Sequence, residues 1–273
     1  MGSNIDPGTM IQNTKLTDSQ YRKLSKIVYD TSGIVLNEKK YRLLVARLSK
    51  RMRITRITDA SDYIDRLGRD EGEFAEFIDA TTTNHTFFFR ENRHCEYLLK
   101  ALDSSVPVKI WSAASSSGEE AYSIAIQLLK DNFSFTIDAS DISDSMLDLG
   151  RAAVYHKDKV RNVPQFMLHA YFQKGKKDWV DHVRVKSEVR QLVSFQKFNL
   201  LSDTPSDIYD VIFCRNVMIY FDKRTRQKVV DSLCRALKPG GLFFVGMAEG
   251  LHGLDHNLVS VLPSGYRKKT GLR

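Results

Sequence analysis

The stretch from Val108 to Leu129 constrains the fold of this chain most, because an apolar run breaks at small residues and restarts with helical spacing. The segment VKIW (108–111) has the composition of a buried strand, and Ser112–Gly118 contains no bulky side chain. After this turn the apolar residues recur on one helix face, namely at Ala121, Ile124, Ala125, Leu128 and Leu129. Small residues at such a junction let backbone N–H groups at the helix start approach a ligand closely. The stretch therefore predicts the first strand and helix of a Rossmann-like sheet, with a ligand at the carboxyl end of the strand.

The glycine content of this turn limits the class of ligand that it can bind. A dinucleotide fold would carry G-x-G-x-x-G here, but only Gly118 is present, and Glu119 and Glu120 occupy the place where a pyrophosphate needs bare amides. A nucleoside cofactor without phosphate, such as S-adenosylmethionine, suits the turn better. Read alone, the turn also fits an ordinary buried strand-to-helix corner.

Length and composition limit the class of protein. With 273 residues, the chain is long enough for one large domain, or for one large and one small domain. Its 42% hydrophobic and 27% charged residues are typical of a soluble globular protein. No apolar run is long enough to span a bilayer, so we expect no membrane insertion. The reduced thiols expected for the three widely spaced cysteines indicate a cytoplasmic location. Residues 1–9 read as a vector remnant before a native start at Met10.

The cysteines and histidines give no sign of a metal site. Cys95, Cys214 and Cys234 are widely spaced among apolar neighbours, which indicates reduced thiols and no zinc ligand pair. His252 and His256 are four residues apart, but a glycine separates them and no third ligand is evident, so we expect a surface loop.

The net charge of +8 and the pI near 9.3 favour an acidic partner. A helix expected at about Asn37–Arg53 concentrates this charge. Its apolar stripe comprises Tyr41, Leu44, Val45, Leu48 and Met52. Its basic residues are Lys39, Lys40, Arg42, Arg47, Lys50, Arg51 and Arg53. Because no acidic residue follows Glu38 in this helix, we favour a binding surface over a merely solvated face.

The periodicities divide the chain into three parts. Residues 10–83 predict a small helical domain, residues 84–106 a connector, and residues 107–273 an α/β domain. The helical domain should contain helices at about 17–33, 37–53, 59–67 and 73–80. In the α/β domain, we expect strands at about 108–111, 135–142, 192–200, 210–217 and 242–247, and two short ones near Val259 and Tyr266. An alternating stretch predicts a small antiparallel β insertion at about 173–190.

Polar residues occur where these strands end. Asp141 ends the second strand, 23 residues beyond Gly118, which is close to the spacing at which a carboxylate meets ribose hydroxyls in nucleotide folds. Four blocks carry such residues, NHTFFFRE, SSSGEE, ASD and FCRNVMIYF.

Taken in order, these blocks resemble the CheR-type glutamate methyltransferases of chemotaxis receptors. The resemblance covers nearly all of Met10–Tyr266, including TTTNHTFFFRE, WSAASSSGEEAYSIA and IFCRNVMIYFDKRTRQ followed by LKPGG. It implies a class I methyltransferase sheet that binds S-adenosylmethionine and releases S-adenosylhomocysteine. It also implies that the enzyme forms methyl esters on glutamates of the cytoplasmic helices of methyl-accepting chemotaxis receptors.

The resemblance assigns roles to individual positions. It places cofactor binding at Asn84, Thr86, Arg90, Glu120, Asp141, Asn199, Leu200, Arg215 and Asn216, and it places Tyr220 near the transferred methyl group. The chemistry suits these roles. A carboxylate such as Asp141 accepts strong hydrogen bonds from ribose hydroxyls, Glu120 matches an ammonium, and the amide of Asn199 with the Leu200 backbone can read an adenine edge. Because a glutamate substrate is already ionised at neutral pH, we expect Arg90 and Tyr220 to position it rather than to act as a base.

Two departures from the family pattern bear on partners. Members that tether a receptor's C-terminal peptide carry a G-x-G turn in the β insertion, whereas this chain has Gly175-Lys176-Lys177, which argues against tethering. Docking of the basic helix 39–53 on an acidic receptor surface is then the main contact hypothesis. The sequence MAEGL also differs from the family, and Glu249 is left without a role. The three residues Phe87–Phe89 fit either a wall of the cofactor pocket or the core of the domain.

Other functions remain to be weighed. A nucleic-acid methyltransferase would share the sheet, the cofactor and the positive charge, but it should carry an Asn/Asp-Pro-Pro-aromatic element where this chain reads CRNVMIY, so we expect no nucleic-acid partner. The second alternative is a receptor-binding module with weak activity, which a cofactor titration would test.

Overall fold

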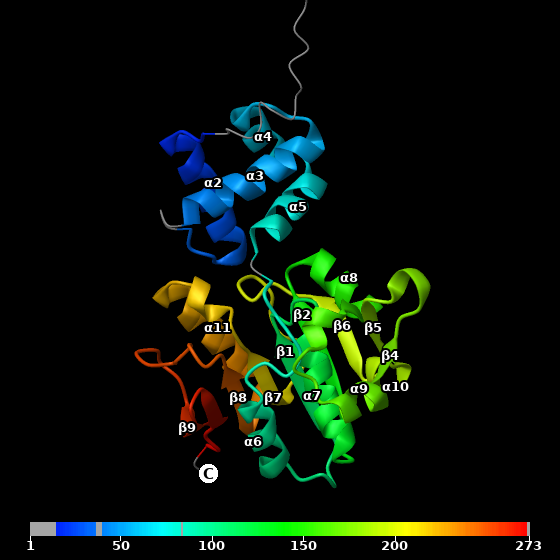
Figure 1. Cartoon of the computed structure of the whole chain (residues 1–273). Coiled ribbons are helices and arrows are strands. Elements are labelled where there is room, and N and C mark those ends of the chain that lie inside the picture. Colours follow the sequence, from blue (N-terminus) through cyan, green and yellow to red (C-terminus); the bar gives the residue numbers. More distant parts are fainter. Residues whose placement is uncertain (1–14, 37–39, 83, 272–273) are drawn as a thin grey trace, which may run out of the picture. The chain divides into compact units, whose positions relative to one another are not determined.

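The computed structural model describes residues 15–36, 40–82 and 84–271. The expected vector remnant at 1–9, the start at Met10 and the first residues of the basic helix, Asn37–Lys39, lie outside this range. The chain divides into two compact units, the helical unit (residues up to 83, with Tyr220–Asp222) and the sheet unit (residues 84–219 and 223–273). Each unit is drawn in Figure 1.

The helical unit contains four described helices, α2 (Asp18–Ser32), α3 (Tyr41–Thr55), α4 (Ala60–Leu67) and α5 (Glu71–Thr81). The predicted ends of the first helix are confirmed, because Thr17 forms a capping box with Gln20 and Gly33 ends the helix at a φ of 73°. The unit's core is made of side chains that are almost completely buried, among them Leu24, Val28, Leu44, Leu48, Met52, Tyr63 and Phe77.

The basic residues of α3 do not all face solvent. The Arg51 guanidinium donates to both carboxylate oxygens of Glu73, at 3.0 and 2.7 Å, and pairs with Glu76 at 2.8 Å. Arg47 donates to the backbone carbonyls of Ala80 and Thr82. The expected positive face is therefore wrong for these two residues, because they bind α5 and its end. The exposed basic residues of α3 are Arg42, Lys50 and Arg53.

The sheet unit contains a seven-stranded sheet in the order β6-β2-β1-β7-β8-β10-β9. Its strands are β1 (Val108–Ala113), β2 (Phe135–Asp141), β6 (Val193–Lys197), β7 (Tyr209–Cys214), β8 (Leu237–Val245), β9 (Leu258–Leu262) and β10 (Gly265–Lys268). The first five strands of this order are parallel, and β10 is antiparallel to both of its neighbours. Its helices are α6 (Arg93–Ala101), α7 (Glu119–Lys130), α8 (Asp144–Ala152) and α11 (Lys223–Ala236). The predicted Rossmann-like fold class is confirmed.

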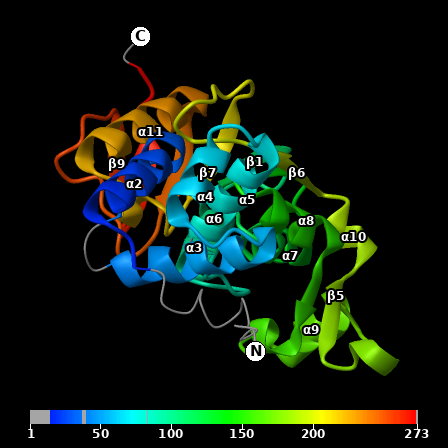
Figure 2. The ribbon, with the colours of Figure 1, turned by 90° about the horizontal axis from the view of Figure 1, so that it is seen from above.

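A second, three-stranded antiparallel sheet forms the insertion, in the order β3-β5-β4. Its strands are β3 (Val154–His156), β4 (Phe172–Lys174) and β5 (His182–Val185), and between and after them come η3 (Lys157–Val160), α9 (Gln165–Tyr171), η4 (Lys177–Trp179) and α10 (Ser187–Arg190). The insertion thus begins at 154, upstream of the range 173–190 read from the sequence. Within the sheet unit, the insertion and strand β9 lie at opposite ends of the large sheet (Figures 1 and 2).

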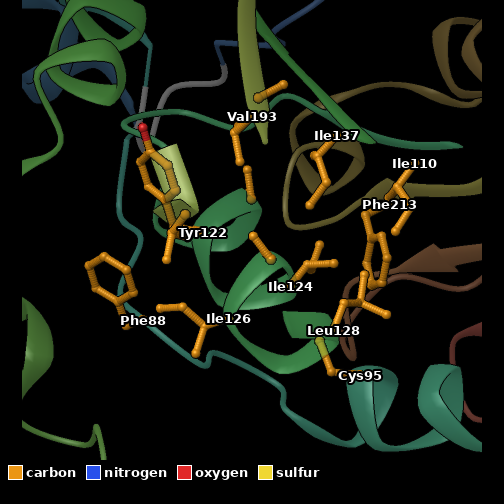
Figure 3. Close-up of a cluster of buried hydrophobic side chains, with 14 of the residues drawn as sticks. Phe88, Cys95, Ile110, Tyr122, Ile124, Ile126, Leu128, Ile137, Val193 and Phe213 are labelled. Atoms are coloured by element: carbon orange, nitrogen blue, oxygen red, sulfur yellow. The ribbon is translucent and has the colours of Figure 1, made fainter. Parts of the chain in front are cut away.

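The core of the sheet unit lies between α7 and the large sheet. Ile124 and Leu128 of α7 face Ile110 and Phe213 of the central strands (Figure 3). Burial of each such side chain contributes about 2 kcal/mol to folding. On the other side of α7, Phe88 packs edge-on against the rings of Tyr155 and Phe172, at centroid distances of 5.0 and 5.1 Å. Phe88 therefore belongs to the core, while Phe87 and Phe89 are only partly buried.

All three cysteines carry free thiols, and Cys95 and Cys214 are buried. Among the described residues, no cluster of His, Cys, Asp and Glu could hold a metal ion. None of the helices that the structure describes is both long and apolar enough to cross a membrane.

Candidate cofactor site

Three neighbouring parallel strands end together at one edge of the large sheet. In register, Ala113 of β1 lies beside Ser140 of β2 on one side and beside Cys214 of β7 on the other. The next polar residues, Asp141 and Arg215, therefore leave the sheet on either side of the turn that follows β1. This edge is where Rossmann-like sheets bind ligands, because the strand order reverses there.

The turn between β1 and α7 is conformationally strained. Ala114 and Ser116 adopt left-handed φ values of 61° and 50°, and Gly118 caps α7 at 89°. Left-handed backbone in non-glycine residues costs free energy, and such strained residues cluster at functional sites. Gly118 also has no room for a side chain, because a Cβ atom there would lie 2.7 Å from the Phe195 ring.

Asp141 fixes this turn to the second strand. Its carboxylate accepts hydrogen bonds from the backbone N–H of Ser116 at 2.8 Å and from that of Ser143 at 3.0 Å, and the residue is only 7% exposed. The Ser115 N–H donates to the Ser140 carbonyl at 2.8 Å. The carboxylate is thus held beside the turn.

Arg215 is the centre of a buried polar network. Its Nε donates to Glu120 at 2.6 Å, and Nη2 donates to the Arg90 carbonyl at 3.0 Å. Nη1 contacts the Glu91 carbonyl at 3.3 Å and Nδ1 of His94 at 3.2 Å. Glu120 also accepts from the Ser112 hydroxyl at 2.7 Å, so the network reaches back to the end of β1.

Burial and charge set the protonation of this network. Burial alone would lower the pKa of Arg215, but the negative charge of Glu120 and its hydrogen bond raise that pKa above its ordinary value. Burial lowers the pKa of His94, and the Arg215 charge lowers it further. Since a guanidinium only donates, Nδ1 of a neutral His94 must be the acceptor, which leaves Nε2–H directed at the Pro263 carbonyl, 3.4 Å away.

Asn216 and two glutamates extend the network to the loop after β8. Asn216 has a left-handed φ of 60°, and its side-chain amide donates to Glu91 at 3.1 Å. The other Glu91 oxygen accepts from the Met247 N–H at 3.0 Å. Glu249 accepts from the Asn216 N–H at 2.7 Å. The sequence interpretation missed Glu91 and left Glu249 unassigned, although Glu91 ends the block TFFFRE that follows the helical domain.

Three other predicted site residues, Asn84, Thr86 and Arg90, lie in the segment between α5 and α6. The Arg90 backbone joins the network, but its guanidinium donates to the His85 carbonyl at 2.8 Å, near the Phe87 ring. Thr86 accepts from Lys159 through its backbone carbonyl, at 2.7 Å. Asn84 is half-buried beside them in the chain.

Asn199 and Leu200 lie in the loop after β6, next to β2 in the sheet. The Asn199 amide oxygen accepts from the Leu201 N–H at 3.0 Å, and its own N–H donates to Asp203 at 2.8 Å, so Asn199 shapes the loop. Tyr220 belongs to the helical unit, where its carbonyl accepts from the Val35 N–H at 2.9 Å and Lys40 lies 4.7 Å from its ring.

The turn has buried donors that a cofactor would satisfy. The hydroxyl oxygens of Ser115 and Ser116 are buried and have no hydrogen-bond partner among the described residues. Buried polar groups are nearly always paired, so two orphans on one ligand turn fit a bound polar molecule. Together with the Asp141 and Glu120 carboxylates, they form a donor and acceptor set that fits a nucleoside with an amino-acid tail.

Comparison with protein families decides the cofactor. Residues 84–264 match the family described as CheR methyltransferase, SAM binding domain, and residues 19–82 match CheR methyltransferase, all-alpha domain. The chain belongs to the CheR methyltransferase family. The predicted resemblance is thereby confirmed, and S-adenosylmethionine is the cofactor of this CheR methyltransferase.

Curated relatives of this CheR chain match it over most of its length. Chemotaxis protein methyltransferase 2 of Pseudomonas aeruginosa is 39% identical, covering 92% of this chain and 93% of that protein. Chemotaxis protein methyltransferases of Borreliella burgdorferi and Escherichia coli are each 36% identical. The former match covers 94% of this chain and 96% of the relative, and the latter 90% and 89%.

Proposed function

We propose that this CheR methyltransferase transfers the methyl group of S-adenosylmethionine to glutamate side chains of chemotaxis receptors, forming methyl esters for sensory adaptation. The observation that carries the proposal is the buried network of Arg215, Glu120, Glu91 and Asn216 beside the unpaired hydroxyls of the β1–α7 turn. The names of the relatives support the chemotaxis role. We place the reaction in the cytoplasm, where the receptor helices lie.

We expect different residues of the site to bind different parts of S-adenosylmethionine. Asp141 would accept from the ribose hydroxyls, and Glu120, held by Arg215, would face the ammonium of the methionine part. Asn199 and Leu200 would contact the adenine edge. Asn84, Thr86 and Asn216 would complete the binding set.

The chemistry then requires alignment more than proton transfer. S-adenosylmethionine supplies a methyl group already activated by its sulfonium. The substrate glutamate is ionised at neutral pH, so no strong base is needed. We assign to Arg90 and Tyr220 the orientation of that carboxylate.

The exposed basic residues of α3 are the proposed receptor contact. Arg42, Lys50 and Arg53 face solvent, whereas Arg47 and Arg51 are used within the helical unit. An acidic receptor surface would complement the three exposed charges.

Tethering of a receptor tail peptide is not part of the proposal. A Cβ atom at Gly175 would lie 1.9 Å from the Trp179 carbonyl, so this glycine is required by its own hairpin. The second glycine of the G-x-G turn in tethering members is Lys177 in this chain, after Gly175 and Lys176. We expect titration with an isolated receptor tail peptide to give no tight binding, and tight binding would overturn this point.

The decisive experiment is transfer of labelled methyl groups to cytoplasmic receptor fragments. We expect base-labile label on the receptor, lost when the target glutamates are changed to alanine, and no label on competing nucleic acid. Labelled nucleic acid would support a nucleic-acid methyltransferase instead. Tight S-adenosylhomocysteine binding without any transfer would favour a receptor-binding module.

A further inference from the structure

One buried carboxylate, Glu249, accepts backbone hydrogen bonds from two loops at the cofactor edge. Its Oε2 accepts from the Asn216 N–H and the Gly246 N–H, both at 2.7 Å, and its Oε1 accepts from the Ile219 N–H at 3.0 Å. Glu249 is only 4% exposed. The post-β7 loop (215–219) and the post-β8 loop (246–250) are therefore joined through a single side chain.

The packing around Glu249 leaves little freedom. A Cβ atom at Gly246 would lie 2.5 Å from the Asn216 Nδ2 atom and 2.7 Å from the Glu249 Oε2 atom, so the two loops touch where the carboxylate binds them. Asn216 itself has a left-handed backbone, which costs free energy unless its surroundings hold it. The bond from Glu249 to the Asn216 N–H supplies that restraint.

A second carboxylate, that of Glu91, also binds Asn216 and the post-β8 loop. It accepts from the Asn216 side chain at 3.1 Å and from the Met247 N–H at 3.0 Å. Asn216 is thus held at its backbone by Glu249 and at its amide by Glu91. Glu91 also lies 3.6 Å from the Arg215 guanidinium, whereas the Glu249 carboxylate accepts from the backbone N–H groups of Asn216, Ile219 and Gly246.

We propose that Glu249 is a positioning residue, which sets the backbone of Asn216 and of the post-β7 loop so that the Asn216 side chain is presented to the cofactor. The proposal rests on the cofactor site assigned above. Glu249 acts through Asn216. Its carboxylate cannot be replaced by an amide, because an NH₂ group would face one of three N–H donors.

The test is the affinity of the full-length Glu249→Gln variant for S-adenosylhomocysteine, measured by titration calorimetry well below its melting temperature. We expect the dissociation constant to rise about tenfold, the effect of losing one charge-assisted hydrogen bond. The matched control is Asp210→Asn, which alters a carboxylate that accepts the Lys109 N–H at 2.9 Å at the far end of β7. Its dissociation constant should stay within about twofold of the parent.

A double-mutant cycle distinguishes positioning from general support of the fold. If Glu249 acts through Asn216, then adding Glu249→Gln to Asn216→Ala should raise the dissociation constant by less than about twofold. Effects that multiply in the double variant, or an unchanged affinity in folded Glu249→Gln, would overturn the proposal.

A second variant covers the case in which Glu249→Gln does not fold. Gly246→Ala pushes a methyl group between Asn216 and Glu249, and it should weaken S-adenosylhomocysteine binding in the same direction. Unchanged binding by this variant would contradict the proposal. Because these measurements use no receptor, they stay decisive even if receptor methylation is not found.

Discussion

Arg215 shows at the scale of one residue why this edge of the sheet is both stable and specific. A guanidinium has five N–H donors in a fixed fork and no acceptor, so every neighbour must accept. Glu120, two backbone carbonyls and a neutral His94 do so. Loss of either member of such a buried pair leaves the other uncompensated, which costs about 3–5 kcal/mol.

The first prediction concerns Glu120. Glu120→Gln should lower the free energy of unfolding by about 3 kcal/mol, because Arg215 loses its ion partner. It should also raise the dissociation constant for S-adenosylhomocysteine about tenfold or more. Urea denaturation and calorimetry measure the two effects, with the exposed Glu96→Gln as control. An affinity within twofold of the parent would exclude Glu120 from cofactor binding.

The second prediction concerns His94 and pH. The pKa of folded His94 lies below the ordinary 6.5, chiefly because the side chain is buried. Below pH 6.5 the unfolded chain therefore binds a proton that the folded chain does not, and stability falls as the pH falls. The loss should approach about 1.4 kcal/mol per pH unit from this group. In His94→Gln, we expect a flatter profile.

Urea denaturation between pH 7.5 and 5.5 measures the difference between the two profiles. The exposed His256→Gln serves as the control and should follow the parent. If His94→Gln also follows the parent, then His94 is protonated in the folded protein and the tautomer assigned above is wrong.

At the scale of elements, α3 has one buried stripe and a positive face reduced to three exposed residues. The prediction is that Lys50→Glu with Arg53→Glu lowers kcat/KM for receptor fragments at least about tenfold at low salt, because it replaces attraction by repulsion. Initial rates of methyl transfer measure this. Lys228→Glu with Lys269→Glu makes the same change in net charge at exposed residues of the sheet unit and should have much less effect. Equal losses in both pairs would indicate that only total charge matters.

The sequence predicts those helices and strands that have a clear apolar spacing or clear end residues of their own. The apolar run before Ser112 and the spacing after Glu120 predicted β1 and α7, and Thr17 and Gly33 marked the ends of α2. Strand β3 and helix α6 carry weaker signals. The former has only three residues, and the latter begins at Arg93, where its N-cap residue Asn92 makes no side-chain hydrogen bond to the helix. Periodicity is weak over such short lengths.

The site was harder to predict than the fold, because its contacts join distant parts of the chain. The Glu91 carboxylate meets the Met247 N–H from 156 residues away, and Asn216 from 125. No local sequence pattern predicts which distant residues these side chains will contact. The resemblance identified the polar residues by position, but the roles of Arg51 and Asn199 within their own units became visible only through their hydrogen bonds.

At the scale of the whole molecule, the chain passes between its two units three times, after residues 83, 219 and 222. The segment Tyr220–Asp222 thereby connects the post-β7 loop, which carries Asn216, to the helical unit. Tyr29 of α2 donates to Asp222 at 2.7 Å within that unit. Tyr220, which we assign to orienting the substrate, therefore belongs to the helical unit, while the proposed cofactor residues belong to the sheet unit.

The net charge of +8 leads to a prediction for the entire protein. Raising the salt from 50 to 300 mM should lower kcat/KM for an acidic receptor fragment about fivefold or more, because the screening length shrinks to a few ångströms. The dissociation constant for S-adenosylhomocysteine should change much less, since that site is buried. Parallel rate and calorimetric measurements over the salt series test both statements. A kcat/KM that is independent of salt would contradict electrostatic docking.

The place of β10 between β8 and β9 has a consequence for biosynthesis. Strand β10 follows β9 in the chain, yet it is β10 that pairs with β8. While the polypeptide leaves the ribosome, one edge of β8 therefore stays unpaired until residue 268 has emerged. By then every residue of the cofactor site up to Glu249 is already outside. A nascent chain that has emerged only as far as residues 250–264 would have its ligand residues complete and one edge of β8 unpaired, a state prone to wrong pairing with other chains.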